Sequence, residues 1–144
     1  MGVAVKEGEG YAINEKMKPL RSFVRKYSES RNLRLLKGDY PRASISWQWR
    51  DEFIMTVDEP IENADYVPAA TTRLSELGLN IVSNVQYYHF SPEHGPVSEA
   101  EALAQSLMLS PLEPRIRRLV RGYFSKASDD REIYYYAVKY GVKQ

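Results

Sequence analysis

Aromatic rings beside basic side chains are the pattern in this sequence that points most directly to a chemistry, the binding of single-stranded nucleic acid. In proteins that do this, flat rings stack on bases while Lys and Arg side chains follow the phosphates. Trp47 and Trp49 lie between Arg42 and Arg50. We expect Trp49 to stack on a base and the two arginines to hold phosphates. The alternative is that both indoles pack in the core, because strands favour tryptophan for structural reasons.

A second aromatic and basic segment lies near the end of the chain. Tyr134, Tyr135 and Tyr136 follow one another, and Lys139 comes shortly after them. Consecutive side chains of a strand point to opposite faces, so at least one of the three rings must point away from the other two. We expect Tyr134 and Tyr136 to stack on bases and Lys139 to contact phosphate, with core packing of the tyrosines as the alternative.

Four arginines fall within one short segment, at positions 115, 117, 118 and 121. On a helix, Arg117 and Arg121 are one turn apart, and Arg118 lies beside Arg121. Guanidinium groups bind phosphate through two parallel hydrogen bonds. We therefore expect Arg117, Arg118 and Arg121 to hold phosphates. The alternative is that they pair with acidic side chains of the same chain or of a second subunit.

Few residues suggest catalysis or metal binding. The two histidines, His89 and His94, are separated by a stretch with proline that fixes no geometry, and we expect surface loop positions for them. Carboxylates cluster over residues 58–65, where a magnesium-dependent enzyme could place ligands, but aspartates at turns commonly bond their own backbone. Cysteine, a phosphate-binding loop and a nucleophile elbow are all absent from the sequence. We expect no cofactor and no metal site, and a non-enzymatic role is favoured.

The formal net charge of +1 conceals three blocks of alternating sign. Residues 1–50 carry 11 Lys/Arg against 5 Asp/Glu, residues 51–114 carry 1 against 11, and residues 115–144 carry 8 against 3. The two basic blocks favour a polyanionic partner. Two alternatives stay open: the acidic block covers the basic ones within the folded chain, or the blocks pair between chains.

Alternation of apolar and polar residues predicts the strands. Over residues 42–50 it places Ala43, Ile45, Trp47 and Trp49 on one face, and residues 53–57 continue it as the second strand of an antiparallel hairpin. Further strands are predicted over residues 33–37, 80–90 and 131–142.

Helical spacing and start signals predict the helices. They cover residues 15–31, residues 68–77, and a segment that starts at the capping box of Ser98. A second capping box at Ser110, with Pro111 in the first turn, starts the arginine-rich helix, which is predicted to end near Gly122.

These elements predict an α+β fold, because helices do not separate the strands regularly. We expect a flexible N-terminal arm over residues 1–10 and a single domain over residues 11–144. In that domain a mostly antiparallel sheet of four to five strands carries helices packed on one face. No apolar run is long enough to cross a membrane, and the N-terminus does not resemble a signal peptide, so we expect a cytoplasmic protein. Sparse Asn and Gln and an excess of Arg over Lys are typical of thermophiles.

The sequence thus predicts a non-enzymatic nucleic-acid-binding protein that favours single-stranded DNA or RNA. Its predicted contact residues are Arg42, Trp49, Arg50, Arg117, Arg118, Arg121, Tyr134, Tyr136 and Lys139. The alternative is an assembly or adaptor protein, for example a viral or multi-subunit component, that forms homo- or hetero-oligomers through paired charge blocks and exposed rings.

Overall fold

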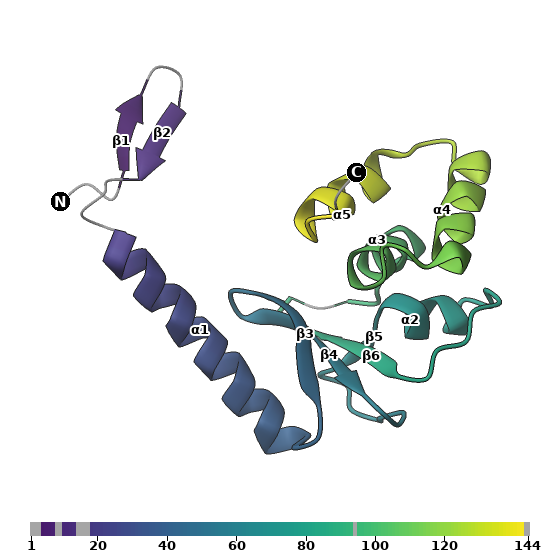
Figure 1. The fold of residues 1–144 in the computed structure, drawn as a ribbon, viewed down its shortest axis with the longest axis horizontal. Coiled ribbons are helices and arrows are strands. Elements are labelled where there is room, and N and C mark those ends of the chain that lie inside the picture. The colour runs from purple at the N-terminus through teal and green to yellow at the C-terminus, as the bar shows by residue number, and fades with distance from the viewer. Residues whose placement is uncertain (1–3, 8–9, 14–17, 94, 143–144) are drawn as a thin grey trace.

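A four-stranded antiparallel sheet in the order β3-β4-β6-β5 lies at the centre of the structure (Figure 1). We analysed a computed structural model that describes residues 4–7, 10–13, 18–93 and 95–142. The strands of the sheet are β3 (Ser44–Trp49), β4 (Glu52–Val57), β5 (Val67–Pro68) and β6 (Gln86–Phe90). The helices are α1 (Lys18–Asp39), α2 (Ala70–Glu76), α3 (Glu99–Leu109), α4 (Pro114–Lys126) and α5 (Arg131–Lys139). The predicted α+β fold is confirmed.

The central strand β4 is buried on both faces because its side chains alternate between two clusters. Phe53 and Met55 pack with Leu36 near the end of α1. Ile54 faces the other way and packs with Ala104 of α3 and with Tyr140, which follows α5. A third apolar cluster joins α2, α3, α4 and α5 above the sheet. The helices α3 and α5 therefore cover one face of β4, while the last turns of α1 contact the other.

A β-bulge in β3 overturns the predicted common face of the residues around Trp47. Ile45 pairs with Met55 whereas Trp47 pairs with Ile54, so the register shifts between Ile45 and Trp47. A bulge adds one residue to a strand, and the side chains after it point to the opposite face. Ile45 thus packs with the cluster that contains Leu36 and Met55, and the Trp47 ring centroid lies 4.6 Å from that of Tyr140.

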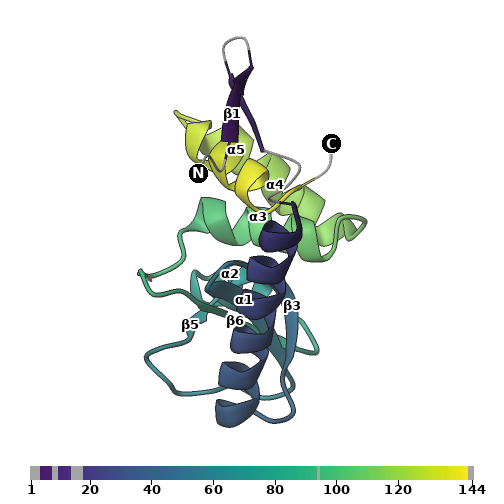
Figure 2. The ribbon, with the colours of Figure 1, turned by 90° about the vertical axis from the view of Figure 1, so that its left-hand side faces the viewer.

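Helix α1 is longer than predicted and replaces the strand expected over residues 33–37. It ends at Asp39, and Asn32 and Leu36 are its buried residues. The run of leucines at 33, 35 and 36 resembles strand alternation, but Leu33 and Leu35 are exposed. Figure 2 shows α1 passing alongside the sheet and continuing beyond it toward its N-terminal end. The strands β1 (Ala4–Glu7) and β2 (Gly10–Ile13) pair as an antiparallel hairpin, partly within the residues predicted to form an arm.

The predicted strand over residues 131–142 is wrong, because this segment forms α5. Tyrosines favour strands, but burial here follows helical spacing: Ile133, Tyr136 and Tyr140 recur at intervals of three and four and pack on neighbouring elements. Tyr134 and Tyr135 are exposed. Tyr134 and Tyr136 therefore do not share a face.

Other boundaries match the predictions in part. The hairpin β3–β4, helix α2 and the start of α3 are confirmed, with Ser98 accepting a hydrogen bond from the Glu101 amide at 3.2 Å. Helix α4 starts after the predicted box: Glu113 is its N-cap and the first-turn proline is Pro114. It continues past Gly122 to Lys126. Strand β6 forms only the second half of the predicted residues 80–90. No helix within the described residues has the length and apolar character of a membrane span.

Candidate nucleic-acid interface

The outer face of α4 and the adjoining face of α5 bring four of the predicted contact residues together. These four are Arg117, Arg118, Arg121 and Tyr134, and together with the neighbouring Phe124 we call them the α4–α5 surface. Helix α4 packs inward through Ile116, Leu119, Val120 and Tyr123, which recur at helical spacing and join the cluster above the sheet. Arg117, Arg118 and Arg121 consequently lie away from this packed side and are exposed.

The arginines of this surface are largely free to bind a ligand. Helix α4 carries five Lys/Arg and no Asp/Glu between its first and last residues. Arg118 and Arg121 are exposed, and their guanidinium groups have no hydrogen bond or ion pair within the described residues. Arg117 Nε donates to the carbonyl oxygen of Pro111 at 2.9 Å, which leaves its terminal N–H groups available. Guanidinium groups with free N–H pairs can bind phosphate oxygens bidentately.

An exposed aromatic pair adjoins the arginines. Phe124 follows Arg121 by three residues on the same helix, and its ring centroid lies 5.8 Å from that of Tyr134 on α5. Phe124 is 40% exposed and Tyr134 is 52% exposed. Rings with open faces next to cations are the arrangement that binds bases and phosphates of a single strand. Phe124 was not predicted, because its partner ring lies on an element that the sequence pattern assigned to a strand.

The residues predicted around β3 occupy a different part of the molecule. Figure 1 shows β3 beside α1, on the opposite side of the structure from α4. Trp49 is 57% exposed at the end of β3, and the Arg50 guanidinium lies 5.4 Å from its ring centroid. Arg42 is exposed in the turn before β3. These residues are not brought together with the arginines of α4.

Lys139 lies in an ion pair within the chain. Its Nζ is 2.8 Å from Glu52 Oε1 and 4.0 Å from Glu101 Oε1. Tyr136 is half-buried, with its ring against that of Tyr135 and a centroid 6.4 Å from that of Tyr140. Both residues therefore belong to the packing of α5 on the sheet and on α3.

A buried polar network connects the sheet with α3 and α5, and sequence reasoning missed it. Since a carboxylate only accepts hydrogen bonds, His89 Nε2 donates to Glu52 Oε1 at 2.6 Å. The Tyr140 hydroxyl donates to Glu101 Oε1 at 2.6 Å and accepts from Gln105 Nε2 at 3.0 Å. Because the members of the network come from four separate elements, no local sequence motif predicts that they lie together.

His89 is thus a buried residue of β6, and the predicted loop position is wrong. His94 lies outside the described residues. Burial raises the pKa of Glu52, but the hydrogen bonds and charges of His89 and Lys139 outweigh it, so the net pKa lies below its ordinary value. Burial and the hydrogen bond to Glu101 raise the pKa of Tyr140. Each member of the network is paired with another, which fits a structural link between β4, β6, α3 and α5.

Within the part of the chain that the structure describes, no group of three or more histidine or carboxylate side chains is placed to hold a metal ion. Asp58 and Asp65, at the ends of the acidic segment 58–65, are exposed, and the Asp65 amide donates a hydrogen bond to Asn63 Oδ1 in a local turn.

Comparison with known proteins gives no further guide to the activity: no family model, no curated protein and no solved structure matches this chain.

Proposed function

We propose that this protein binds single-stranded nucleic acid through the α4–α5 surface. The observation that carries the proposal is the placement of Arg118 and Arg121, which are exposed and unpaired within the described residues, beside the exposed ring pair of Phe124 and Tyr134. In this arrangement the arginines contact phosphates and the rings stack on bases. No catalytic step is part of the proposal.

The test is fluorescence anisotropy of a labelled, mixed-sequence single strand of about 20 nucleotides, as DNA and as RNA, a length that exceeds the site size of common single-strand binders. The variant R118E/R121E reverses two charges of the α4–α5 surface. The matched control R31E/R34E reverses two exposed arginines on α1 that were not predicted to contact nucleic acid, so both variants change the net charge equally.

We expect R118E/R121E to weaken binding by about tenfold or more at low salt, because two phosphate contacts become repulsive. The control should lose clearly less affinity than R118E/R121E, because it has the same long-range charge effect but leaves the α4–α5 surface unchanged. Absence of binding by the wild-type protein, or equal losses in the two variants, would contradict the proposal.

A second function, assembly with another copy of the chain, is favoured by an apolar stripe on α1. Leu20, Phe23, Val24 and Tyr27 recur at helical spacing and are between 51% and 66% exposed. At 3.6 residues per turn they lie nearly opposite Leu36, which packs on the sheet, so the chain's own sheet does not cover them.

The charges favour the acidic segment 58–65 of a second copy as the partner of the basic side chains of α1, and this pairing would bring the second copy next to the apolar stripe. Helix α1 carries seven Lys/Arg against two Asp/Glu, and residues 58–65 carry four Asp/Glu and no Lys/Arg. Light scattering at low and high salt tests this function. A dimer that dissociates with salt and with F23S/Y27S supports it, and a monomer at all concentrations refutes it.

A further inference from the structure

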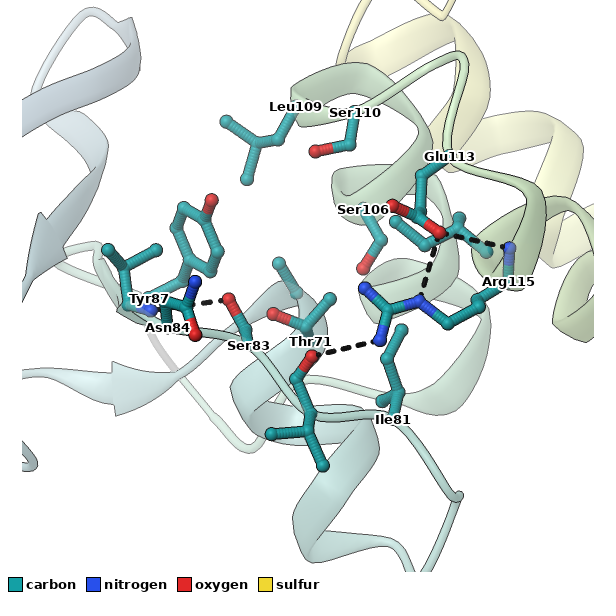
Figure 3. Close-up of a pocket in the computed structure, with 14 residues that line it drawn as sticks. Thr71, Ile81, Ser83, Asn84, Tyr87, Ser106, Leu109, Ser110, Glu113 and Arg115 are labelled. Carbon is teal, nitrogen blue, oxygen red and sulfur yellow. Dashed lines mark hydrogen bonds and ion pairs between the residues drawn. The ribbon is translucent and has the colours of Figure 1, made fainter.

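A cavity of about 400 Å³ lies at the junction of α2, the segment before β6, the end of α3 and the start of α4 (Figure 3). This volume is within the range of pockets that hold small molecules. Part of the wall is apolar, from Ile81, Leu109 and Ile116 among others. The rest is rich in hydroxyl groups, which belong to Thr71, Ser83, Tyr87, Ser106 and Ser110.

The hydroxyl group of Thr71 is the strongest sign that the cavity takes a ligand. Thr71 is only 8% exposed, and its Oγ1 has no hydrogen-bond partner among the described residues. Burying a hydroxyl group without a partner destabilises a protein, and native structures rarely keep one. Thr71 is one of the residues that line the cavity (Figure 3), and a polar atom of a ligand bound there would supply the partner that its hydroxyl group lacks.

The backbone next to Thr71 is held in an unfavourable conformation. Ala70 has a φ of 48°, in the left-handed region that residues with a Cβ avoid. Its amide donates to Gln105 Oε1 at 2.8 Å, which fixes this geometry from α3. Strain of this kind persists only where the surroundings enforce it, and it concentrates at ligand sites.

The two charged side chains that line the cavity neutralise each other. Arg115 Nε lies 2.9 Å from Glu113 Oε1, and Arg115 Nη1 donates to the carbonyl oxygen of Val82 at 3.3 Å. The hydrogen bond from Arg115 holds the pKa of Glu113 below its ordinary value, so the pair stays charged and balanced at neutral pH. A ligand of this cavity therefore meets hydroxyl groups and apolar surface without an excess charge.

We propose that the cavity binds an uncharged, polyhydroxylated small molecule with one apolar face, the chemistry shared by nucleosides and monosaccharides. Its hydroxyl groups pair with Thr71 and Ser110, whereas Ser106 Oγ already donates to the carbonyl oxygen of Ala102 at 2.7 Å, and its apolar face lies against Leu109 and Ile81. The residues of the α4–α5 surface do not line the cavity, so this site and the proposed nucleic-acid interface succeed or fail independently.

The site is tested by titrating the protein with adenosine, uridine, glucose or inositol, each separately and at millimolar concentration. Binding is monitored by NMR through the chemical shifts of the backbone amides. Two substitutions separate the role of the hydroxyl group of Thr71 from the role of its shape. T71V keeps the shape and removes the hydroxyl group, and T71S keeps the hydroxyl group and removes the methyl group. We expect at least one probe to shift amides within residues 70–71, 81–87 and 106–116. T71V should weaken its binding by about tenfold, the effect of one hydrogen bond, and T71S should bind within about twofold of the wild type.

Unfolding of the ligand-free protein in urea gives a second test, in which T71V is expected to raise stability although it weakens ligand binding. T71V should unfold at a higher urea concentration than the wild type, because an unpartnered buried hydroxyl is removed. Nucleoside binding and monosaccharide binding both support the proposal and identify the source of the hydroxyl groups. If none of the four probes shifts these amides, or if T71V binds the probe as tightly as T71S, the proposal is overturned.

Discussion

The carboxylate of Glu52 accepts hydrogen bonds from both His89 and Lys139, and it is the residue on which the pH dependence of stability is expected to centre. Its pKa lies below the ordinary value of 4.5 because these partners outweigh the effect of burial. A group whose pKa is lower in the folded state than in the unfolded state stabilises the fold when it is ionised. That contribution is present above pH 4.5 and is lost as the pH falls through the folded-state pKa.

We therefore predict that the free energy of unfolding falls as the pH is lowered from about 5 toward 3, and that E52Q flattens this dependence. At neutral pH, E52Q should lose about 1.5–3 kcal/mol, the usual worth of a hydrogen bond to a charged group. Urea unfolding across this pH range measures both effects, with E59Q in the exposed acidic segment as the control. An E52Q profile parallel to that of the wild type would show that the network does not titrate as described.

Single residues near the hairpin show what the sequence could and could not foretell. The turn at Arg50 and Asp51 lacks the glycine or asparagine of most tight hairpins, and the structure places Arg50 at a φ of 58°. Its carbonyl oxygen accepts a hydrogen bond from the buried Asn32 of α1 at 2.7 Å. The hairpin was predictable from alternation, but this support from a distant helix was not.

At the scale of elements, local sequence patterns predicted the secondary structure correctly where no tertiary contact opposed them. Ser98 caps α3 as predicted, but the Glu101 side chain bonds Tyr140 rather than completing the capping box. Residues 131–142 show the opposite case. Their tyrosines favour strands locally, and packing against α3 and the sheet selects a helix instead. Helix propensity and strand propensity are weak next to such tertiary contacts.

The cap of α3 gives a prediction for an element as a unit. Ser98 Oγ accepts from the Glu101 amide and donates to Glu132 Oε1 at 2.8 Å, which also ties α3 to α5. S98A should lower the free energy of unfolding by about 1 kcal/mol, the typical value of an N-cap. S125A, at an exposed serine in the last turns of α4, should change it by less than about 0.5 kcal/mol. Equal effects of the two substitutions in urea unfolding would contradict this role of Ser98.

At the scale of the whole molecule, no acidic side chain among the described residues forms an ion pair with Arg117, Arg118 or Arg121 of α4, whereas Arg115 of the same helix pairs with Glu113. The ion pairs of Arg25, Arg73, Arg115 and Arg131 join neighbours within four residues. Lys139 does reach from the last basic block to Glu52 and Glu101 in the acidic one. The charge blocks were visible in the sequence, but which cations stay exposed depends on the direction in which α4 packs. The convergence of Arg121, Phe124 and Tyr134 was hidden for the same reason.

The salt dependence of single-strand binding tests the central claim most directly. Each phosphate neutralised by an arginine contributes about −0.7 to the slope of log affinity against log salt, so three arginines predict a slope of roughly −2. R118E/R121E should lose most of this slope, whereas Y134A should keep it and weaken binding by about 1–3 kcal/mol through lost stacking. A wild-type affinity that does not change with salt, or a slope that R118E/R121E leaves intact, would contradict binding through the α4–α5 surface.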